Sequence, residues 1–181
     1  SRSLGERFLV AEELMPGLFP DRWDAAARTW IPRGGKQAPT IREAFTAFTR
    51  DIRVIQEDNQ NGLVVVAMNW SDPVRAAQPA NGYVDLANST LRARAIEEAR
   101  ASLQFLDAEL GKTQSIPVRE SIFRLVETQT KKIMLANVRR DYAFKVIDPA
   151  VPPDDGDVAR PRRLLMAAVG ALLGLTLGVL A

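Results

Sequence analysis

Hydrophobic residues follow three different patterns along the chain, and the plainest is an uninterrupted apolar run at its C-terminal end. Residues 164–181 carry no charged side chain, and about 18 apolar residues are enough to predict a transmembrane helix. Small residues recur at every fourth position of this run, where they share one helix face and allow two spans to pack closely. They are Gly170, Gly174 and Gly178. We therefore expect a transmembrane helix over residues 164–181. Because the chain stops inside the apolar run, we expect this helix to be truncated.

The middle of the chain shows helical periodicity. Apolar residues spaced by three, four and seven predict a long amphipathic helix over residues 74–110, interrupted near Pro79 and Gly82, and a second helix over 116–138. A short connector between two long helices predicts an antiparallel helical hairpin, at about residues 73–139. The apolar stripe that we expect to pack between neighbouring copies consists of Leu91, Leu103, Leu106, Leu110, Ile122, Leu125 and Ile133.

Strand-like patterns flank the helical region. Residues 51–57 alternate in part, residues 63–70 are rich in β-branched side chains, and Asn61-Gly62 between them is typical of a hairpin turn. The second of these strands is nearly all apolar, so we expect both of its faces to be covered. Residues 141–148 alternate again and predict a third strand. Together these strands predict one small sheet.

Two helix starts are marked by a hydroxyl side chain followed three residues later by glutamate. This spacing is that of a capping box, in which the two side chains satisfy backbone N–H groups that the first turn leaves without partners. The pairs are Ser3 with Glu6, and Thr40 with Glu43. They predict one helix near the N-terminus and one short helix after residue 40.

A proline-rich stretch over residues 149–163 separates the strands and hairpin from the apolar run. Proline fixes the backbone and removes N–H donors, so we expect a semi-rigid linker, whose prolines are Pro149, Pro152, Pro153 and Pro161. Three arginines stand at the expected membrane boundary, Arg160, Arg162 and Arg163. Taken alone, the positive-inside rule would place them in the cytoplasm.

Composition narrows the possible chemistry. The 181 residues include neither cysteine nor histidine, which excludes disulfides, thiol catalysis, histidine-dependent triads and most zinc sites. Basic and acidic residues number 24 and 22, a balance that gives no basic patch for nucleic acid. We identify no catalytic, cofactor-binding or metal-binding residues and expect a protein that is not an enzyme and needs no cofactor.

Several segments, in their order along the chain, resemble the chain-length determinant (Wzz-type) family of bacterial polysaccharide co-polymerases. They are residues 134–150, the proline-rich linker with its arginines, the glycine-repeat run, residues 1–23, and Trp70-Ser71-Asp72-Pro73. The resemblance implies an inner-membrane protein whose first span precedes residue 1, with residues 1–148 in the periplasm between two spans. It also implies a ring of identical subunits that acts with a membrane polysaccharide polymerase, in contact with the bilayer and with lipid-linked glycan as a further candidate partner. This orientation opposes the positive-inside reading, and we adopt it.

The resulting prediction is an α+β fold with a small membrane-proximal sheet, packed helices, a long protruding helical hairpin and a C-terminal transmembrane helix. The predicted function is that of an oligomeric scaffold which regulates chain length in the synthesis of O-antigen, capsule or exopolysaccharide. One alternative is the membrane-anchoring part of a larger co-polymerase, with a cytoplasmic tyrosine-kinase domain or partner. A tail-anchored coiled-coil adaptor in the cytoplasm, which the arginines favour, is another.

Overall fold

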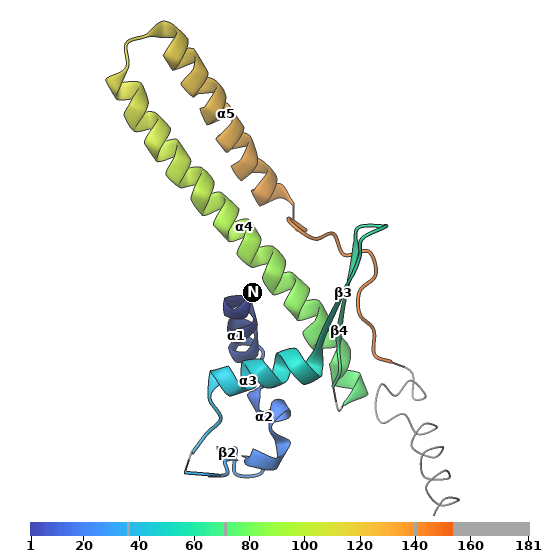
Figure 1. The fold of residues 1–181 in the computed structure, drawn as a ribbon. Coiled ribbons are helices and arrows are strands. Elements are labelled where there is room, and N and C mark those ends of the chain that lie inside the picture. Colours follow the sequence, from blue (N-terminus) through green and yellow to red (C-terminus); the bar gives the residue numbers. More distant parts are fainter. Residues whose placement is uncertain (36, 71, 140, 154–181) are drawn as a thin grey trace, which may run out of the picture.

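The protein consists of a base of short elements and a long helical hairpin that projects from it (Figure 1). The structure is a computed structural model and describes residues 1–35, 37–70, 72–139 and 141–153. One helix, α4 (Pro73–Lys112), belongs to both parts, because its first turns lie in the base and the rest forms one arm of the hairpin. The second arm is α5 (Ile116–Val138).

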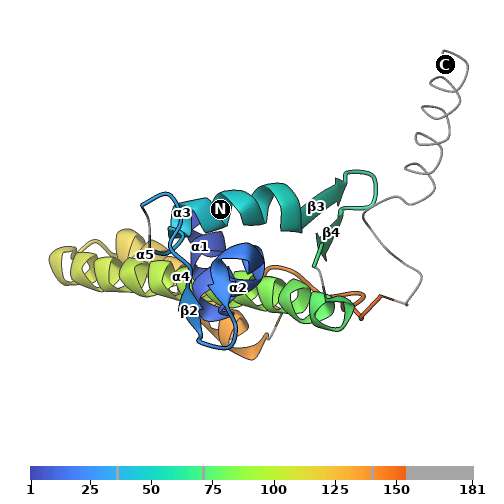
Figure 2. The ribbon, with the colours of Figure 1, turned by 90° about the horizontal axis from the view of Figure 1, so that it is seen from below.

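The base is assembled from the N-terminal part of the chain and the beginning of α4. Seen from below, α1, α2 and α3 gather beside α4, and the β3–β4 pair extends away from them (Figure 2). The N-terminal elements are α1 (Arg2–Ala11), α2 (Met15–Leu18), the 3₁₀ turn η1 (Pro20–Arg22), β1 (Trp23–Asp24), β2 (Thr29–Trp30), α3 (Ile41–Ala47) and the π-helical turn η2 (Phe48–Ile52). The short strands β1 and β2 pair with each other, and their two tryptophan rings stack edge to face.

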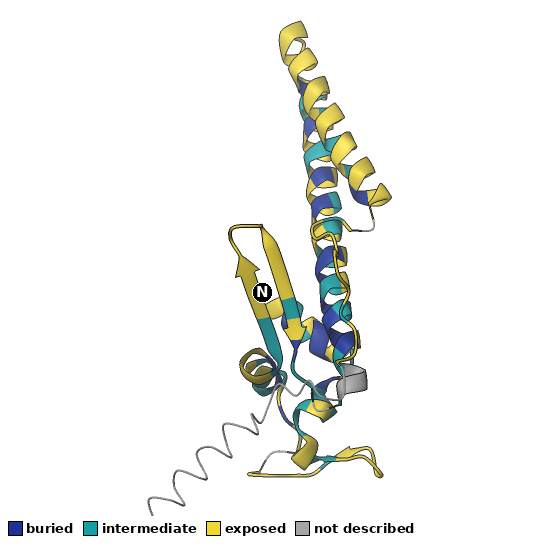
Figure 3. Ribbon diagram, turned by 90° about the vertical axis from the view of Figure 1, so that its right-hand side faces the viewer, coloured by how far each residue is buried: buried dark blue, intermediate teal, exposed yellow. Residues whose placement is uncertain are grey.

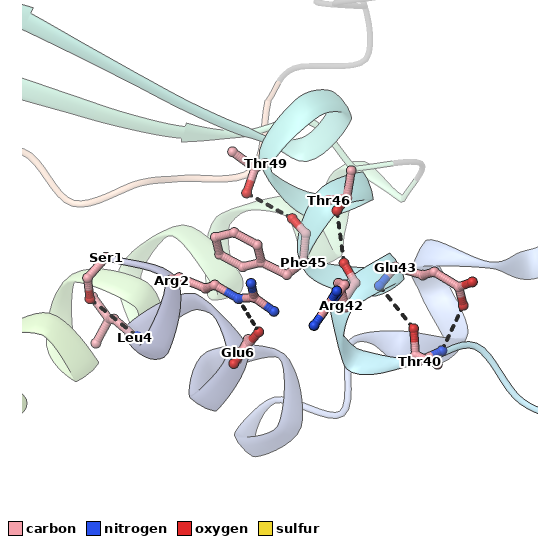
Figure 4. A network of polar contacts seen from close by, with 10 residues as sticks. All are labelled: Ser1, Arg2, Leu4, Glu6, Thr40, Arg42, Glu43, Phe45, Thr46 and Thr49. Atoms are coloured by element: carbon pink, nitrogen blue, oxygen red, sulfur yellow. Dashed lines mark hydrogen bonds and ion pairs between the residues drawn. The ribbon is translucent and has the colours of Figure 1, made fainter.

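Helix caps define where the base helices begin, as Figure 4 shows. The capping box predicted before α3 is confirmed: the Glu43 N–H donates to the Thr40 hydroxyl at 3.2 Å, and the Thr40 N–H donates to the Glu43 carboxylate at 2.9 Å. The box predicted at Ser3 is wrong. The cap of α1 is Ser1, whose hydroxyl accepts the N–H of Leu4, because the helical pattern already includes residue 2.

Three aromatic rings hold α4 to the base. Phe8 of α1 and Phe48 of η2 are fully buried, and Tyr83 of α4 is nearly so. The Tyr83 ring meets Phe8 edge to face at a centroid distance of 5.1 Å and Phe48 at 6.0 Å. Its hydroxyl accepts a hydrogen bond of 2.8 Å from Arg53, whose guanidinium also lies over both the Phe48 and Tyr83 rings. Such ring pairs add about 0.5–1.5 kcal/mol each beyond the area that they bury.

The predicted β-hairpin is confirmed, with β3 (Arg53–Asp58) paired antiparallel to β4 (Leu63–Met68). Gly62 closes the turn at φ 65°, a left-handed conformation that favours glycine. The expectation that both faces of β4 are covered is wrong, since Leu63, Val64 and Val65 are exposed and only the root of the strand reaches the core (Figure 3).

Both arms of the helical hairpin are confirmed, and α5 has the predicted bounds. The predicted interruption near Pro79 and Gly82 is wrong, because α4 continues through both. Proline removes one helical N–H bond. Here packing of the same turns compensates for that loss: Ala80 and Tyr83 lie in the core, and Pro79 is itself buried.

The predicted third strand over residues 141–148 is wrong, and the single sheet is therefore wrong as well. The only sheets among the described residues are the two separate two-stranded pairs. Residues 143–150, which we call the strap, run back along α4 as irregular chain (Figure 1). The strap finds its hydrogen-bond partners on a helix, on the side chains of Asn81 and Asn88, rather than on a neighbouring strand.

The fold class requires one further correction. The α+β class holds, but no helix within the described part of the chain is both long enough and apolar enough to cross a bilayer. The transmembrane component of the predicted fold is therefore wrong as a description of this structure. The apolar run over residues 164–181 on which it depended lies outside the described residues.

Substituting Gly5 tests the contact between α1 and α3. A Cβ at Gly5 would lie 2.5 Å from the ring of Phe45, so Gly5→Ala should destabilise the fold by about 1–3 kcal/mol through overpacking. Gly111 is the matched control, because it also lies in a helix but a Cβ there meets nothing within 4 Å. Gly111→Ala should be neutral or stabilising by up to about 1 kcal/mol. Urea unfolding followed by circular dichroism measures the free energy of unfolding of both variants. Equal changes in the two would contradict the close contact between Gly5 and Phe45.

Acid should loosen the β3–β4 turn. The pKa of Asp58 is lowered by hydrogen bonds from the Gln60 N–H and the Asn61 side chain. A lowered pKa stabilises the turn above the unfolded value of about 3.9, and this contribution is lost as pH falls through the lower folded pKa. An NMR titration of the Gln60 amide should show the transition below pH 3.9. It should be absent in Asp58→Asn, and a midpoint above 3.9 in the native chain would contradict the sign.

Candidate interaction surface on the helical hairpin

The interior of the hairpin is a narrow seam between α4 and α5. Buried positions recur along the length of α4 (Figure 3). The buried side chains of the seam are mostly small: Ala95, Ala99, Leu106, Ile122 and Ala136. Alanine allows two helix backbones to approach closely, and the larger Leu106 and Ile122 fill the seam toward the tip. This packing holds α5, which among the described elements has α4 as its main neighbour (Figure 1).

The structure divides the seven residues of the predicted stripe into three groups. Leu106 and Ile122 are buried within the seam. Leu103, Leu110 and Ile133 are half-buried at its edges, and Leu91 and Leu125 are exposed. Most of the stripe therefore packs inside one chain, and only a part of it is left for a neighbouring copy.

A shallow groove of about 460 Å³ runs beside the seam, between the two helices. Its lining is Ala101, Ser102, Phe105, Leu106, Leu125 and Gln129. The Phe105 side chain is 64% exposed and that of Leu125 is 51% exposed. An ion pair between Glu98 and Lys132, at 3.7 Å, joins the two helices. By helical periodicity it lies on the side of the groove, because Glu98 precedes Phe105 by seven residues, or about two turns. We call this side the groove flank.

A second apolar flank lies on the other side of α5. Phe123 precedes Leu125 by two residues, which corresponds to about 200° around a helix, so the two side chains point to opposite sides. Met134 follows Phe123 by eleven residues and returns to within about 20° of the same direction. Phe123 is 53% exposed and Met134 is 61% exposed. We call this side the Phe123 flank.

Sequence reasoning missed Phe105, Phe123 and Met134. None lies on the predicted stripe, because the stripe follows the seam and these residues flank it. The sequence does carry a signal for them, because each is a large apolar side chain on an otherwise polar helix face, outside the main stripe. Several such side chains on one face mark an interaction surface.

The remaining chemistry of the hairpin is that of a solvated surface. A hydrogen bond and ion pair with Lys131, at 2.6 Å, lower the pKa of Glu127. A lowered pKa keeps a carboxylate ionised and makes it a weaker proton acceptor. No cluster of three or more acidic side chains that could hold a metal ion occurs in the described ranges. The arrangement is suited to binding a second apolar surface.

The other predicted site residues are at the C-terminal end. Pro149, Pro152 and Pro153 are exposed in the last described segment. The remaining ones lie outside the described residues: Pro161, Arg160, Arg162, Arg163, Gly170, Gly174 and Gly178. Their roles in the linker, at the membrane boundary and in helix packing stay predictions.

Truncating two adjacent residues separates the seam from the flank. Ile122→Ala removes a buried side chain and should destabilise the hairpin by about 2–5 kcal/mol. Phe123→Ala removes a largely exposed side chain and should change the stability of the isolated chain by no more than about 0.5 kcal/mol. Urea unfolding at low protein concentration, where association does not contribute, measures both. A larger effect at Phe123 would place that residue in the fold rather than on the surface.

Comparison with known proteins adds no assignment to this geometry. No family model matches the chain, and neither a curated protein nor a solved structure matches it. The resemblance to chain-length determinants, which was drawn from the order of segments, therefore stays a prediction, and the function rests on the site itself.

Proposed function

We propose that this protein is a self-assembling scaffold that regulates the chain length of a bacterial surface polysaccharide, on the periplasmic side of the inner membrane. In this role the protein acts through its shape and its contacts, by organising a polymerase that extends lipid-linked glycan. The order of sequence segments supports the polysaccharide part of the proposal. The observation that carries the scaffold part is the pair of different apolar flanks on opposite sides of the α4–α5 hairpin.

The two flanks suit association between identical copies. The groove flank carries a shallow groove lined in part by Phe105 and Leu125, whereas the Phe123 flank presents Phe123 and Met134. Two different flanks on opposite sides of one hairpin favour head-to-tail contacts, in which the groove flank of one copy meets the Phe123 flank of the next. Contacts of this type close into rings when the rotation between copies permits it. An assembly through one flank alone would instead be a two-fold dimer.

Aspartate substitutions distinguish these two kinds of assembly. Phe105→Asp blocks the groove flank, and Phe123→Asp blocks the other. A charge at an aromatic position that the contact between copies buries should weaken that contact by about 2 kcal/mol or more, roughly 30-fold. Each variant alone should therefore be monomeric by mass photometry where the native chain forms a closed oligomer. An equimolar mixture of the two should form one heterodimer, because it retains one intact groove flank and one intact Phe123 flank.

Gln104→Asp is the matched control, since it adds the same charge to an exposed residue next to Phe105. This variant should assemble like the native chain. The same alleles in the native host test the polysaccharide role: Phe105→Asp and Phe123→Asp should shift the glycan ladder, and Gln104→Asp should not. A monomeric native chain would contradict the scaffold. A normal oligomer in the native chain with an unchanged ladder in both flank variants would contradict the polysaccharide role alone.

A further inference from the structure

Two asparagines on α4 hold the strap by its backbone. The Asn88 side-chain oxygen accepts the N–H groups of Ala143 and Phe144, at 3.0 and 2.8 Å, and its NH₂ donates to the Phe144 carbonyl at 2.8 Å. Asn81 repeats the arrangement with Ala150, accepting its N–H and donating to its carbonyl, both at 2.9 Å. Each side-chain amide therefore engages both backbone groups of one strap residue, Phe144 or Ala150. An adjacent residue in an antiparallel sheet engages the same two groups.

The spacing of the two asparagines sets the direction of the strap. Asn81 and Asn88 are seven residues apart, which is about two helical turns and about 10.5 Å along α4 on nearly one face. The residue later in the strap, Ala150, pairs with the earlier asparagine, so the strap runs antiparallel to α4. The strap therefore runs along α4 in the same direction as α5, which ends at Val138.

No side chain of the strap is fully buried. Of residues 143–150 only Ala150 is even half-buried, and the apolar Phe144, Val146 and Ile147 are exposed. The clamping residue Asn88, by contrast, is only 4% exposed. Asparagine is rarely so buried without complete hydrogen bonding, and here the strap backbone supplies partners for both its oxygen and its nitrogen. The hydrogen bonds of this contact therefore depend on the backbone of the strap and not on its side chains.

We propose that Asn81 and Asn88 form a binding site for non-helical peptide backbone, which the chain's own strap fills in this structure and which a separate peptide of the same class can fill. Binding at this site depends little on most side chains of the peptide, but it depends on the direction in which the peptide runs. This inference goes beyond the scaffold role and does not depend on it. Because few buried apolar contacts hold the strap, it undocks more readily than the core unfolds, and the site then becomes available to a second peptide.

Two substitutions in the strap test whether the backbone is what the site recognises. Phe144→Pro removes the N–H that donates to Asn88, whereas Phe144→Ala removes the side chain and keeps the N–H. Hydrogen exchange of the Ala143 and Ala150 amides is the measurement. Phe144→Pro should speed exchange by at least about tenfold, the loss expected for a hydrogen bond to a buried amide, and Phe144→Ala should leave it nearly unchanged. Equal acceleration in both variants would overturn the proposal.

Substitutions on α4 test the other side of the contact. Asn88→Ala should speed exchange at Ala143 and Phe144 to a similar extent. Asn137→Ala is the matched control, because Asn137 is exposed on α5 and donates to the Ile133 carbonyl of its own helix. It should leave exchange of the strap amides unchanged. Where Asn88→Ala fails to fold by circular dichroism, Phe144→Pro gives the same answer with α4 unaltered.

Binding in trans is the decisive measurement. A fluorescent, acetylated peptide of residues 141–153 is titrated into the full chain, and its anisotropy is recorded. The Phe144→Pro chain, whose own strap is released, should bind the peptide at least about tenfold more tightly than the native chain, whose site is occupied. Adding Asn88→Ala to that chain should abolish the gain. Failure of the peptide to bind the Phe144→Pro chain, or binding that Asn88→Ala does not weaken, would overturn the proposal.

Discussion

Packing against α4 is the constraint on which the whole molecule depends. Near its beginning, Ala80 and Tyr83 lie in the aromatic core of the base. Asn81, which lies between these two residues in sequence, holds the strap together with Asn88, and beyond them Ala95, Ala99 and Leu106 form the seam with α5. Three kinds of partner, an aromatic cluster, an irregular chain and a second helix, thus follow one another along a single helix. Each of these partners packs against α4 through a different kind of interaction.

The change of partner along α4 explains the change in residue type. An α-helix satisfies its own backbone groups, so α5 needs only small apolar residues opposite it. The strap is neither helix nor strand, and the N–H and C=O groups that face α4 need partners from elsewhere. Asparagine offers a donor and an acceptor on one short side chain, and it occurs at the two positions of α4 where the strap lies closest.

The helices and the β3–β4 hairpin could be predicted from the sequence because their signals are local. Periodicity gave the bounds of α5, the Thr40–Glu43 pair gave the start of α3, and Asn61-Gly62 gave the turn. The seam was also visible as a stripe. Its role in contacts between copies stays a prediction, because periodicity identifies an apolar face and does not identify the surface that covers it.

The features that could not be predicted depend on contacts between distant parts of the chain. The alternation over residues 141–148 is equally compatible with a strand and with the strap, and only the position of Asn88, more than fifty residues earlier, distinguishes them. The apolar β4 suggested a buried strand, yet Leu63 and Val65 are exposed in the described structure. Phe105 and Phe123 could be identified as surface residues only once the position of the seam showed which sides of the hairpin face outward.

The continuity of α4 through Pro79 also has a mechanical consequence. From Tyr83 in the core to Lys112 at the tip the helix has no interruption, and at 1.5 Å per residue this distance is about 45 Å. Such a helix behaves as a lever arm with its pivot in the aromatic cluster. A rotation of only 10° at the base would displace the tip by about 8 Å on this geometry. Small adjustments around Phe8 and Phe48 are thereby amplified into displacements larger than a side-chain contact distance at the far end of the rod.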